Sequence, residues 1–310
     1  MEQLYEQLQT KTPFLDLTRD YGFKIVFADP DRKELMIGFL NKIITERNII
    51  DIRFLNTDIL APEEDGKSPN YDISCLDDEG NRFLVEIQKE MYDEFRDRLM
   101  VYSGDPLTKI LKRGEGYESV KTLYVISILD GYLKVNGEDK PLKDRLLRRA
   151  YLRMDEGSKI LSDKLNFLFL QLPVAKEPDA ESDFITKWAW YVRNMAKFSK
   201  KPDGLDDYFS KLFDAADRNN VEQRKLSIYD RMERDAIQIE AEKRYAIREA
   251  REEALAEGEA KGEARGKAEG KAEGKGESQR EIAKNLLGLG ADTDMISKAT
   301  GLTEEEIRSL

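Results

Sequence analysis

The strongest constraint on this chain is a stretch near its end with too little apolar surface to build a core. Residues 258–277 read GEAKGEARGKAEGKAEGKGE, with a glycine at every fourth position from Gly258 to Gly274. Each glycine destabilises a helix by about 1 kcal/mol relative to alanine. The stretch is therefore either a solvated spacer or a helix whose glycine stripe lets a second helix approach closely, by analogy with small-residue packing in membranes.

The patterns along the 310 residues predict four regions. They are a sheet-containing α/β core (10–175), a helical subdomain (180–220), a long charged helix with the glycine repeat (221–285) and a small helical tail (286–310). We expect the long helix to make the protein a homo-oligomer.

The tail contains the sequence TGLTEEEI, in which Thr303 and Glu306 predict a capping box. The same sequence suggests a helix-turn-helix. Its recognition positions are acidic, however, which favours a small assembly module.

The chain contains no histidine. This absence excludes Ser-His-Asp and Cys-His catalytic systems and all zinc sites with histidine ligands. A general base must then be a carboxylate, a lysine, a tyrosine or a metal-bound water. Any metal site would consist mostly of oxygen ligands, which favour Mg²⁺, Mn²⁺ or Ca²⁺.

Cys75 is the one cysteine, so the chain forms no internal disulfide, which is typical of a reducing compartment. The sequence has neither a transmembrane run nor a signal peptide, so we expect a cytoplasmic protein without a membrane partner. The net charge of −11 argues against bulk attraction to nucleic acid, which would need a local basic patch.

Apolar spacing predicts the elements of the core. These are helices at 31–46 and 91–112, an extended stretch at 49–60, strands at 71–76 and 82–88, and buried strands at 121–129 and 165–172. Beyond them, helices are predicted at 184–198 and 205–216. The order indicates a mixed sheet flanked by helices.

The two strands at 71–88 form a predicted hairpin. Its loop is three residues long and ends at Gly80, which suits the left-handed position of such a loop. The resulting register places Asp72 opposite Glu86, with Gln88 two residues further along the same face. Opposed carboxylates are destabilising, so a proton, a cation or a basic neighbour must offset them.

Two interpretations of this acidic pair remain open. Without histidine, a divalent metal held by both carboxylates is the natural candidate. Alternatively, the two acids are solvated on an exposed face and pair with Arg98.

Several stretches together resemble a known family. They are DYGFKIVF, MIGFLNKII, YDISCLDDEGNRFLVEIQ, FRDRLMVYSGDPL, GEGYESVKTLYVISIL, the GEARGKAEG repeats and TGLTEEEI. In this order they resemble the Rpn family of recombination-promoting nucleases, also described as transposases, in the PD-(D/E)XK nuclease superfamily. The resemblance covers most of the chain and implies a restriction-endonuclease-like fold.

The resemblance also implies an activity, a Mg²⁺-dependent DNA endonuclease linked to recombination or mobile elements. Asp72 and Glu86 would hold the metal, with the backbone carbonyl of Ile87 as a third ligand. Gln88 stands where the superfamily usually has lysine, and a neutral amide can only orient water. The missing cationic role would then fall to Lys24 or Lys89.

Asp20 could be an accessory acid. Two further groups of residues have both a functional and a structural interpretation. Arg98 and Tyr102, four residues apart on one helical face, either lie beside the site or belong to the packing of the helix, with Tyr102 in the core and Arg98 paired with an acidic neighbour. The basic run 143–153, with Arg145, Arg148 and Arg149, is either a DNA-facing patch or an amphipathic helix with a solvated basic face.

A rival interpretation keeps the fold but not the chemistry. The acidic net charge and the missing lysine at Gln88 favour a catalytically weak or inactive nuclease-fold module that binds DNA or protein.

Overall fold

The computed structural model describes the chain with gaps at 1–11, 56–70, 90–93, 109–115, 136–139 and 158. The end of the predicted stretch 49–60, the polar loop after it and both ends of the predicted helix 91–112 lie outside the described residues. Contacts divide the chain into two units, Met1–Arg234 and Asp235–Leu310. Each is described by itself.

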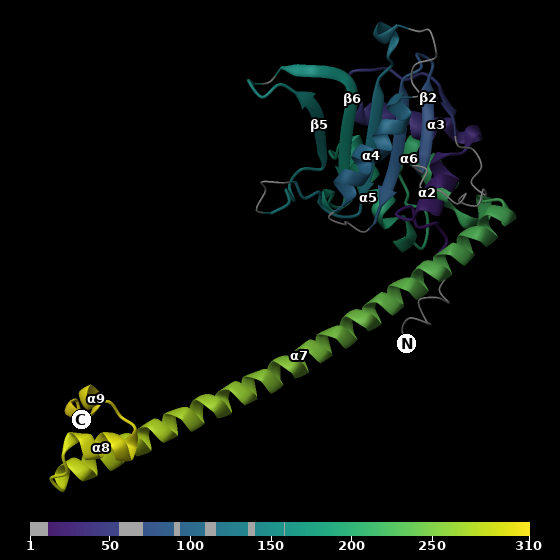
Figure 1. Ribbon diagram of the computed structural model, residues 1–310. Coiled ribbons are helices and arrows are strands. Elements are labelled where there is room, and N and C mark those ends of the chain that lie inside the picture. Colours follow the sequence, from purple (N-terminus) through teal and green to yellow (C-terminus); the bar gives the residue numbers. More distant parts are fainter. Residues whose placement is uncertain (1–11, 56–70, 90–93, 109–115, 136–139, 158) are drawn as a thin grey trace. The chain divides into compact units, whose positions relative to one another are not determined.

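A six-stranded mixed sheet forms the centre of the first unit (Figure 1). Across the sheet lie β1 (Ile52–Phe54), β2 (Ile73–Asp77), β3 (Arg82–Gln88), β4 (Leu123–Leu129), β6 (Ile160–Gln171) and β5 (Leu147–Arg153). The three central strands β3, β4 and β6 run parallel. The antiparallel β2 pairs with β3 on one side, and the antiparallel β5 pairs with β6 on the other.

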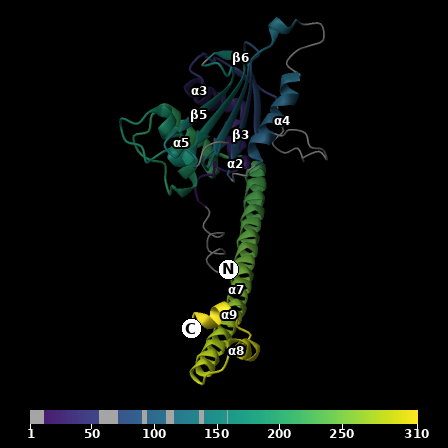
Figure 2. The ribbon, with the colours of Figure 1, turned by 60° about the vertical axis from the view of Figure 1, so that its left-hand side comes forward.

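Helices flank both faces of the sheet, as the sequence predicts. On one side lie α2 (Asp20–Phe27), α3 (Lys33–Ile43), α5 (Phe184–Asn194) and α6 (Asp207–Ala216), and on the other α4 (Phe95–Thr108) (Figure 2). Single 3₁₀ turns separate them: η1 (Pro30–Arg32), η2 (Tyr117–Ser119), η3 (Leu172–Val174), η4 (Met195–Lys197) and η5 (Arg218–Asn220).

Alternation along the strands sends side chains into two separate cores. In the larger core, Ile73, Phe83 and Val85 of the sheet pack against the side that carries the four helices. There Trp188 stacks on Phe39 with ring centroids 4.1 Å apart. The smaller core lies under α4 and contains Tyr71, Leu84, Phe95 and Leu99. Strict alternation along the strand predicts Tyr71 on the same face as Ile73, and this prediction is wrong, because Tyr71 belongs to the smaller core and Ile73 to the larger one. The chain bends before β2 begins, so strict alternation does not extend to Tyr71.

The hairpin loop has the predicted form. Gly80 adopts a φ of +86°, and the ladder pairs Ser74 with Leu84 and Leu76 with Arg82. Asn81 connects the loop to the next strand, because its side-chain oxygen accepts a hydrogen bond from the Thr122 N–H at 3.1 Å. The hairpin itself is closed by hydrogen bonds from the Asp77 N–H to the Asn81 carbonyl at 3.0 Å and from the Gly80 N–H to the Asp77 carbonyl at 3.1 Å, which fix the register of β2 and β3 at the loop.

The basic run 143–153 forms a strand from Leu147 onward, so the alternative of an amphipathic helix is wrong. Leu147–Arg153 pairs antiparallel with β6 at the edge of the sheet. The reason lies in β6, an apolar strand that is buried for most of its C-terminal half and needs a backbone partner on each side.

Gln171, at the end of β6, is fully buried and connects two chain segments. Its Oε1 accepts a hydrogen bond from the Leu133 N–H at 2.7 Å. Its Nε2 donates to the carbonyl oxygens of Leu142 at 2.9 Å and Arg145 at 2.6 Å. One side chain thereby fixes the chain both after β4 and before β5.

The helix α7 (Gln223–Gly288) is 66 residues long, and the boundary between the two units falls within it. Its first turns belong to the first unit, where Tyr229 is buried and its hydroxyl accepts a hydrogen bond from the Asp16 N–H at 2.8 Å. The glycine repeat is helical throughout, and a β-carbon added at Gly258, Gly262 or Gly266 would meet no described atom within 4 Å.

In the second unit, α8 (Thr293–Thr300) and α9 (Glu304–Arg308) follow α7. A small core of Ala283, Ile296, Leu302 and Ile307 holds them together. The predicted capping box of Thr303 and Glu306 is present.

Among the described residues, no helix combines the length and the apolar character needed to cross a lipid bilayer.

We predict that Gly22→Ala destabilises the fold while Gly104→Ala does not. Both glycines are helical, but a β-carbon at Gly22 would overlap the backbone oxygen of Asp16, whereas one at Gly104 meets nothing within 4 Å. Overpacking of this kind lowers the free energy of unfolding by about 1–3 kcal/mol. Alanine at Gly104 should raise it by up to about 1 kcal/mol. Urea denaturation measures both, and equal effects would contradict the close packing at Gly22.

Candidate active site

Asp72 lies directly before β2, at the point where the chain enters the sheet. The ladder between β2 and β3 ends at the pair Ile73 and Val85. Beyond it, the Asp72 carboxylate takes the place of a backbone acceptor, and its Oδ2 accepts a hydrogen bond from the Ile87 N–H at 2.7 Å. The predicted register made Asp72 the ladder partner of Glu86. In the structure the ladder stops one residue earlier, and the Asp72 carboxylate binds Ile87, the residue next to Glu86 on β3.

Glu86 points to the α4 side of the sheet, where Arg98 contacts it. The Arg98 Nη2 lies 2.5 Å from Glu86 Oε1 and also donates to Gln88 Oε1. The guanidinium carbon lies 5.6 Å from the centre of the Phe95 ring and 5.8 Å from that of Tyr102. Arg98 thus contacts the acidic pair, while Tyr102 packs beside Arg98 and the smaller core.

The first helix of the core supplies a cation from the other side. Lys24 Nζ lies 3.3 Å from Asp72 Oδ1. Asp20, one turn earlier on α2, is close enough to raise the pKa of both Asp72 and Glu86. Lys89 instead contacts Asp16 at 3.9 Å, so of the two candidate lysines only Lys24 contacts the acidic pair.

Burial dominates the electrostatics of the pair. Asp72 and Glu86 are each 8% exposed. Burial raises the pKa of Asp72 to about 7, with Asp20 and Glu86 acting in the same direction and Lys24 and the Ile87 N–H opposing them. Burial also raises the pKa of Glu86, against the effect of Arg98. The two carboxylates are thus poised to take up a proton or an additional cation.

Two buried oxygens at this site make no hydrogen bond to the described residues. They are Oε2 of Glu86 and Oγ of Ser127, which faces Glu86 across β3 and β4. A buried acceptor left in this state destabilises the fold by about 1–3 kcal/mol. Ser127 was not among the predicted site residues, although a single polar residue inside the apolar run LYVISIL is a signal for it.

The donor set fits a hard divalent cation. Carboxylate oxygens are the preferred ligands of Mg²⁺ and Ca²⁺, and the unsatisfied Glu86 oxygen is available to bind one. Within the described residues, no three His, Cys, Asp or Glu side chains come together as a metal-binding group. A cation here would therefore need backbone or water oxygens as further ligands.

The three predicted DNA-binding arginines do not share one face. Arg148 lies in the same row of the sheet as Glu86, because the ladders pair Glu86 with Ser127, Ser127 with Phe169 and Phe169 with Arg148. Arg149 points to the opposite face, and Arg145 is exposed before β5 begins. Successive side chains of a strand point to opposite faces of the sheet, so Arg148 and Arg149 are separated in a way that they would not be on the basic face of a helix.

We predict that Asp72→Asn stabilises the fold at high pH but not at low pH. The asparagine keeps an acceptor for the Ile87 N–H and removes a charge that burial disfavours. Because the pKa of Asp72 rises from 3.8 to about 7 on folding, the wild-type carboxyl favours the folded state below pH 3.8, and this stability is lost as the pH rises through 7.

Urea denaturation in EDTA at pH 8, 6 and 4 measures the effect. The gain from Asp72→Asn should be largest at pH 8 and should shrink towards pH 4. Asp78→Asn, on the exposed hairpin loop, is the matched control and should show no such trend. A gain independent of pH would contradict the proposed titration.

Comparison with known protein families gives two matches. A family model described as PD-(D/E)XK nuclease family transposase matches residues 17–249. A second, described as Rpn/YhgA-like nuclease family, C-terminal HTH domain, matches residues 277–310. The searches of curated proteins and of solved structures found no match.

The second match corrects one expectation. The acidic residues of α9 led us to prefer an assembly module, but the tail is a helix-turn-helix domain. The first match covers most of the chain and bears out the predicted restriction-endonuclease-like α/β fold. The chain therefore belongs to the PD-(D/E)XK nuclease family transposases and carries the C-terminal helix-turn-helix domain of the Rpn/YhgA-like nucleases.

Proposed function

We propose that this protein is a metal-dependent DNA endonuclease that hydrolyses phosphodiester bonds during recombination or the movement of mobile elements. The observation that supports it most is the buried pair of Asp72 and Glu86, with one Glu86 oxygen unsatisfied and cationic side chains on both sides. A fold gains no stability from such a pair, so its presence favours a chemical role.

In this proposal Mg²⁺, or Mn²⁺ or Ca²⁺ in its place, binds Asp72, Glu86 and the backbone carbonyl of Ile87. The Ile87 N–H faces Asp72, and the carbonyl of the same strand residue points to the same side. When bound, the cation supplies a Lewis acid next to the scissile phosphate.

The neighbouring side chains have separate roles in the proposal. Gln88 orients the attacking water, and Lys24 supplies the positive charge that a lysine at position 88 would otherwise provide. Asp20 keeps the carboxylates' affinity for a cation high by adding negative charge. Arg98 packs on the rings of Phe95 and Tyr102. In the proposal its guanidinium moves from Glu86 to a phosphate oxygen of the DNA when the substrate binds.

The proposed DNA path runs along the α4 side of the sheet. Arg148 is three strands from Glu86 in the same row, which at about 4.8 Å per strand places it about 14 Å away. At that distance it can contact a phosphate that flanks the scissile one, and the exposed Arg145, three residues earlier in the chain, can add a further contact. The helix-turn-helix domain would add a second contact with DNA.

Two observations favour the rival function, a catalytically weak or inactive module that binds DNA or protein. Arg98 already neutralises Glu86, and Gln88 replaces the usual lysine. In that case Arg98 permanently occupies the position of the metal ion beside Glu86.

We predict that the wild-type protein nicks plasmid DNA in Mg²⁺, and that Glu86→Gln and Asp72→Asn each reduce the rate by at least about 100-fold, because each removes a metal ligand. EDTA should abolish the nicking. Asp78→Asn, which changes an acid of the same hairpin outside the site, should cleave like wild type. If wild type and Glu86→Gln are equally inert in Mg²⁺, Mn²⁺ and Ca²⁺, the rival function replaces this one.

We also propose that the protein is a homo-oligomer through α7, as a parallel pair of helices. Two rows of charges follow the glycine repeat, each at four-residue spacing. The first row changes from negative to positive and the second from positive to negative: Glu259, Glu263, Lys267, Lys271, Lys275, and Lys261, Arg265, Glu269, Glu273, Glu277.

These charges suit two helices better than one. The ion pairs shown within the rows, Glu263 with Lys267 and Arg265 with Glu269, lie where the sign changes. Elsewhere in the rows, neighbours four residues apart carry like charges, which destabilises a lone helix. In a parallel pair in register, the first row of one copy faces the second row of the other, and each facing pair is opposite in sign.

We predict that changing Lys267, Lys271 and Lys275 together to Glu in the full-length chain converts a dimer into a monomer. Each substitution places like charges opposite one another across the pair. Adding Glu269→Lys, Glu273→Lys and Glu277→Lys restores opposite signs and should restore the dimer. Light scattering measures the mass, and a monomeric wild type at micromolar concentration would contradict the proposal.

A cytoplasmic location completes the proposal. Its support is the lone Cys75, which is buried and whose pKa burial raises to about 12. The thiol is therefore a neutral core group with no partner for a disulfide.

A further inference from the structure

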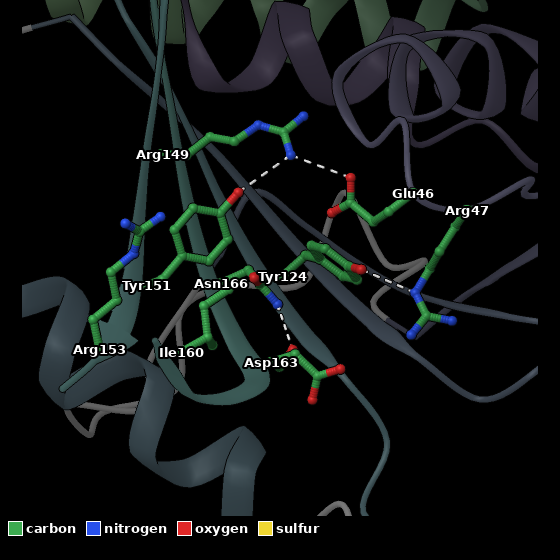
Figure 3. Close-up of a pocket in the computed structure, with 9 residues that line it drawn as sticks. All are labelled: Glu46, Arg47, Tyr124, Arg149, Tyr151, Arg153, Ile160, Asp163 and Asn166. Carbon is green, nitrogen blue, oxygen red and sulfur yellow. Dashed lines mark hydrogen bonds and ion pairs between the residues drawn. The ribbon is translucent and has the colours of Figure 1, made fainter. Parts of the chain in front are cut away.

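A second polar cavity lies in the first unit, away from the acidic pair. It has a volume of about 520 Å³ and lies between the segment after α3 and the strands β4, β5 and β6 (Figure 3). Arginine and tyrosine dominate its lining, with Arg47, Arg149, Arg153, Tyr124 and Tyr151. A volume of this size is typical of sites for small organic ligands.

This cavity is separate from the proposed nuclease site. Tyr124 pairs in register with Phe83, three rows before Glu86. Both rings belong to the larger core, on the face of the sheet opposite to Glu86. Whatever binds in the cavity therefore does not touch Asp72 or Glu86.

Fixed side chains form two sides of the cavity. The Tyr124 ring stacks on Phe83 at 5.2 Å, and its hydroxyl accepts a hydrogen bond from Arg47 Nε at 2.9 Å. Arg149 donates to Glu46 at 3.2 Å and also to the Ile43 carbonyl. These contacts hold the two arginines in place before any ligand arrives, which lowers the entropy lost on binding.

The β5–β6 hairpin supplies an available charge and an aromatic surface. The Arg153 guanidinium lies 5.3 Å from the centre of the Tyr151 ring. Within the described part of the chain, no carboxylate lies within ion-pair distance of Arg153, which is exposed at the rim. Arginine binds phosphate oxygens through paired N–H groups, and aromatic rings stack on bases.

Hydrogen-bond acceptors complete the lining. Asp163 lines the cavity, next to the buried Asn166, whose side-chain nitrogen donates to the Asp163 backbone carbonyl at 2.8 Å. Carboxylate oxygens accept hydrogen bonds from sugar hydroxyls and base amino groups. The cavity thus combines an anion site, an aromatic surface and acceptors.

We propose that this cavity binds one nucleotide, with its phosphate on Arg153 and its base against Tyr151. The nucleotide can be a free mononucleotide or the 5′-phosphorylated end of a single strand, since both present the same chemistry. The site goes beyond the proposed endonuclease function and does not depend on it.

Isothermal titration calorimetry of the full-length protein in EDTA tests the proposal. The probes are the four deoxynucleoside 5′-monophosphates, the matching nucleosides, and a single-stranded ten-nucleotide DNA with and without a 5′-phosphate. We expect saturable binding of a monophosphate, or of the phosphorylated strand alone, and binding at least about tenfold weaker for the probe that lacks the phosphate. The first result assigns the free nucleotide as ligand, and the second assigns the strand end.

Two variants and one control locate the binding. Arg153→Ala should weaken it at least about tenfold, and Tyr151→Leu should weaken it while keeping an apolar side chain. Lys159→Ala removes an exposed cation of the same hairpin outside the cavity lining and should bind like wild type. The proposal fails if no probe binds, if nucleosides bind as tightly as nucleotides, or if Arg153→Ala binds like wild type. Because EDTA prevents cleavage, failure here is independent of the nicking assay.

Discussion

The hydrogen bond from the Ile87 N–H to the Asp72 carboxylate determines how the rest of the site is arranged. The bond pairs the Ile87 N–H of β3 beyond the end of its ladder with β2, where the donor would otherwise lack a partner from that strand. It also brings a buried acid next to Glu86. The cations that pair with the two acids come from the helices on both faces of the sheet, Lys24 from α2 on one side and Arg98 from α4 on the other. The same carboxylate thus both completes the hydrogen bonding of the sheet and forms half of the acidic pair.

Much of the fold could be predicted because local patterns determine it. Gly80 and the alternation of the hairpin fix the register of β2 and β3, and apolar runs identify β4 and the end of β6. The edge strand β5 was harder, since a basic run has no strong strand pattern of its own and pairs only because β6 needs a neighbour. Tyr71 was misplaced for a similar reason, because alternation holds only where the ladder does.

The candidate site was predictable in its residue types and less so in its contacts. The hairpin register supplied Asp72, Glu86 and Gln88, and the resemblance added Lys24. In the structure Arg98 contacts Glu86 and Gln88, and Lys24 contacts Asp72. The choice between Lys24 and Lys89 depended on helix packing that no motif records. The cavity itself was not predictable, although the basic run 143–153 contributes to it, because Arg47, Tyr124 and Arg153 come from three separate segments.

Gln171 has a consequence for how this sheet can vary. Its amide holds the backbone at Leu133 on one side and at Leu142 and Arg145 on the other, so the ends of the crossover from β4 to β5 are anchored independently of the chain between them. Insertions or deletions in that connection should leave the edge strand in register. A relative with a longer crossover would keep the same six-stranded order, provided that the glutamine remains.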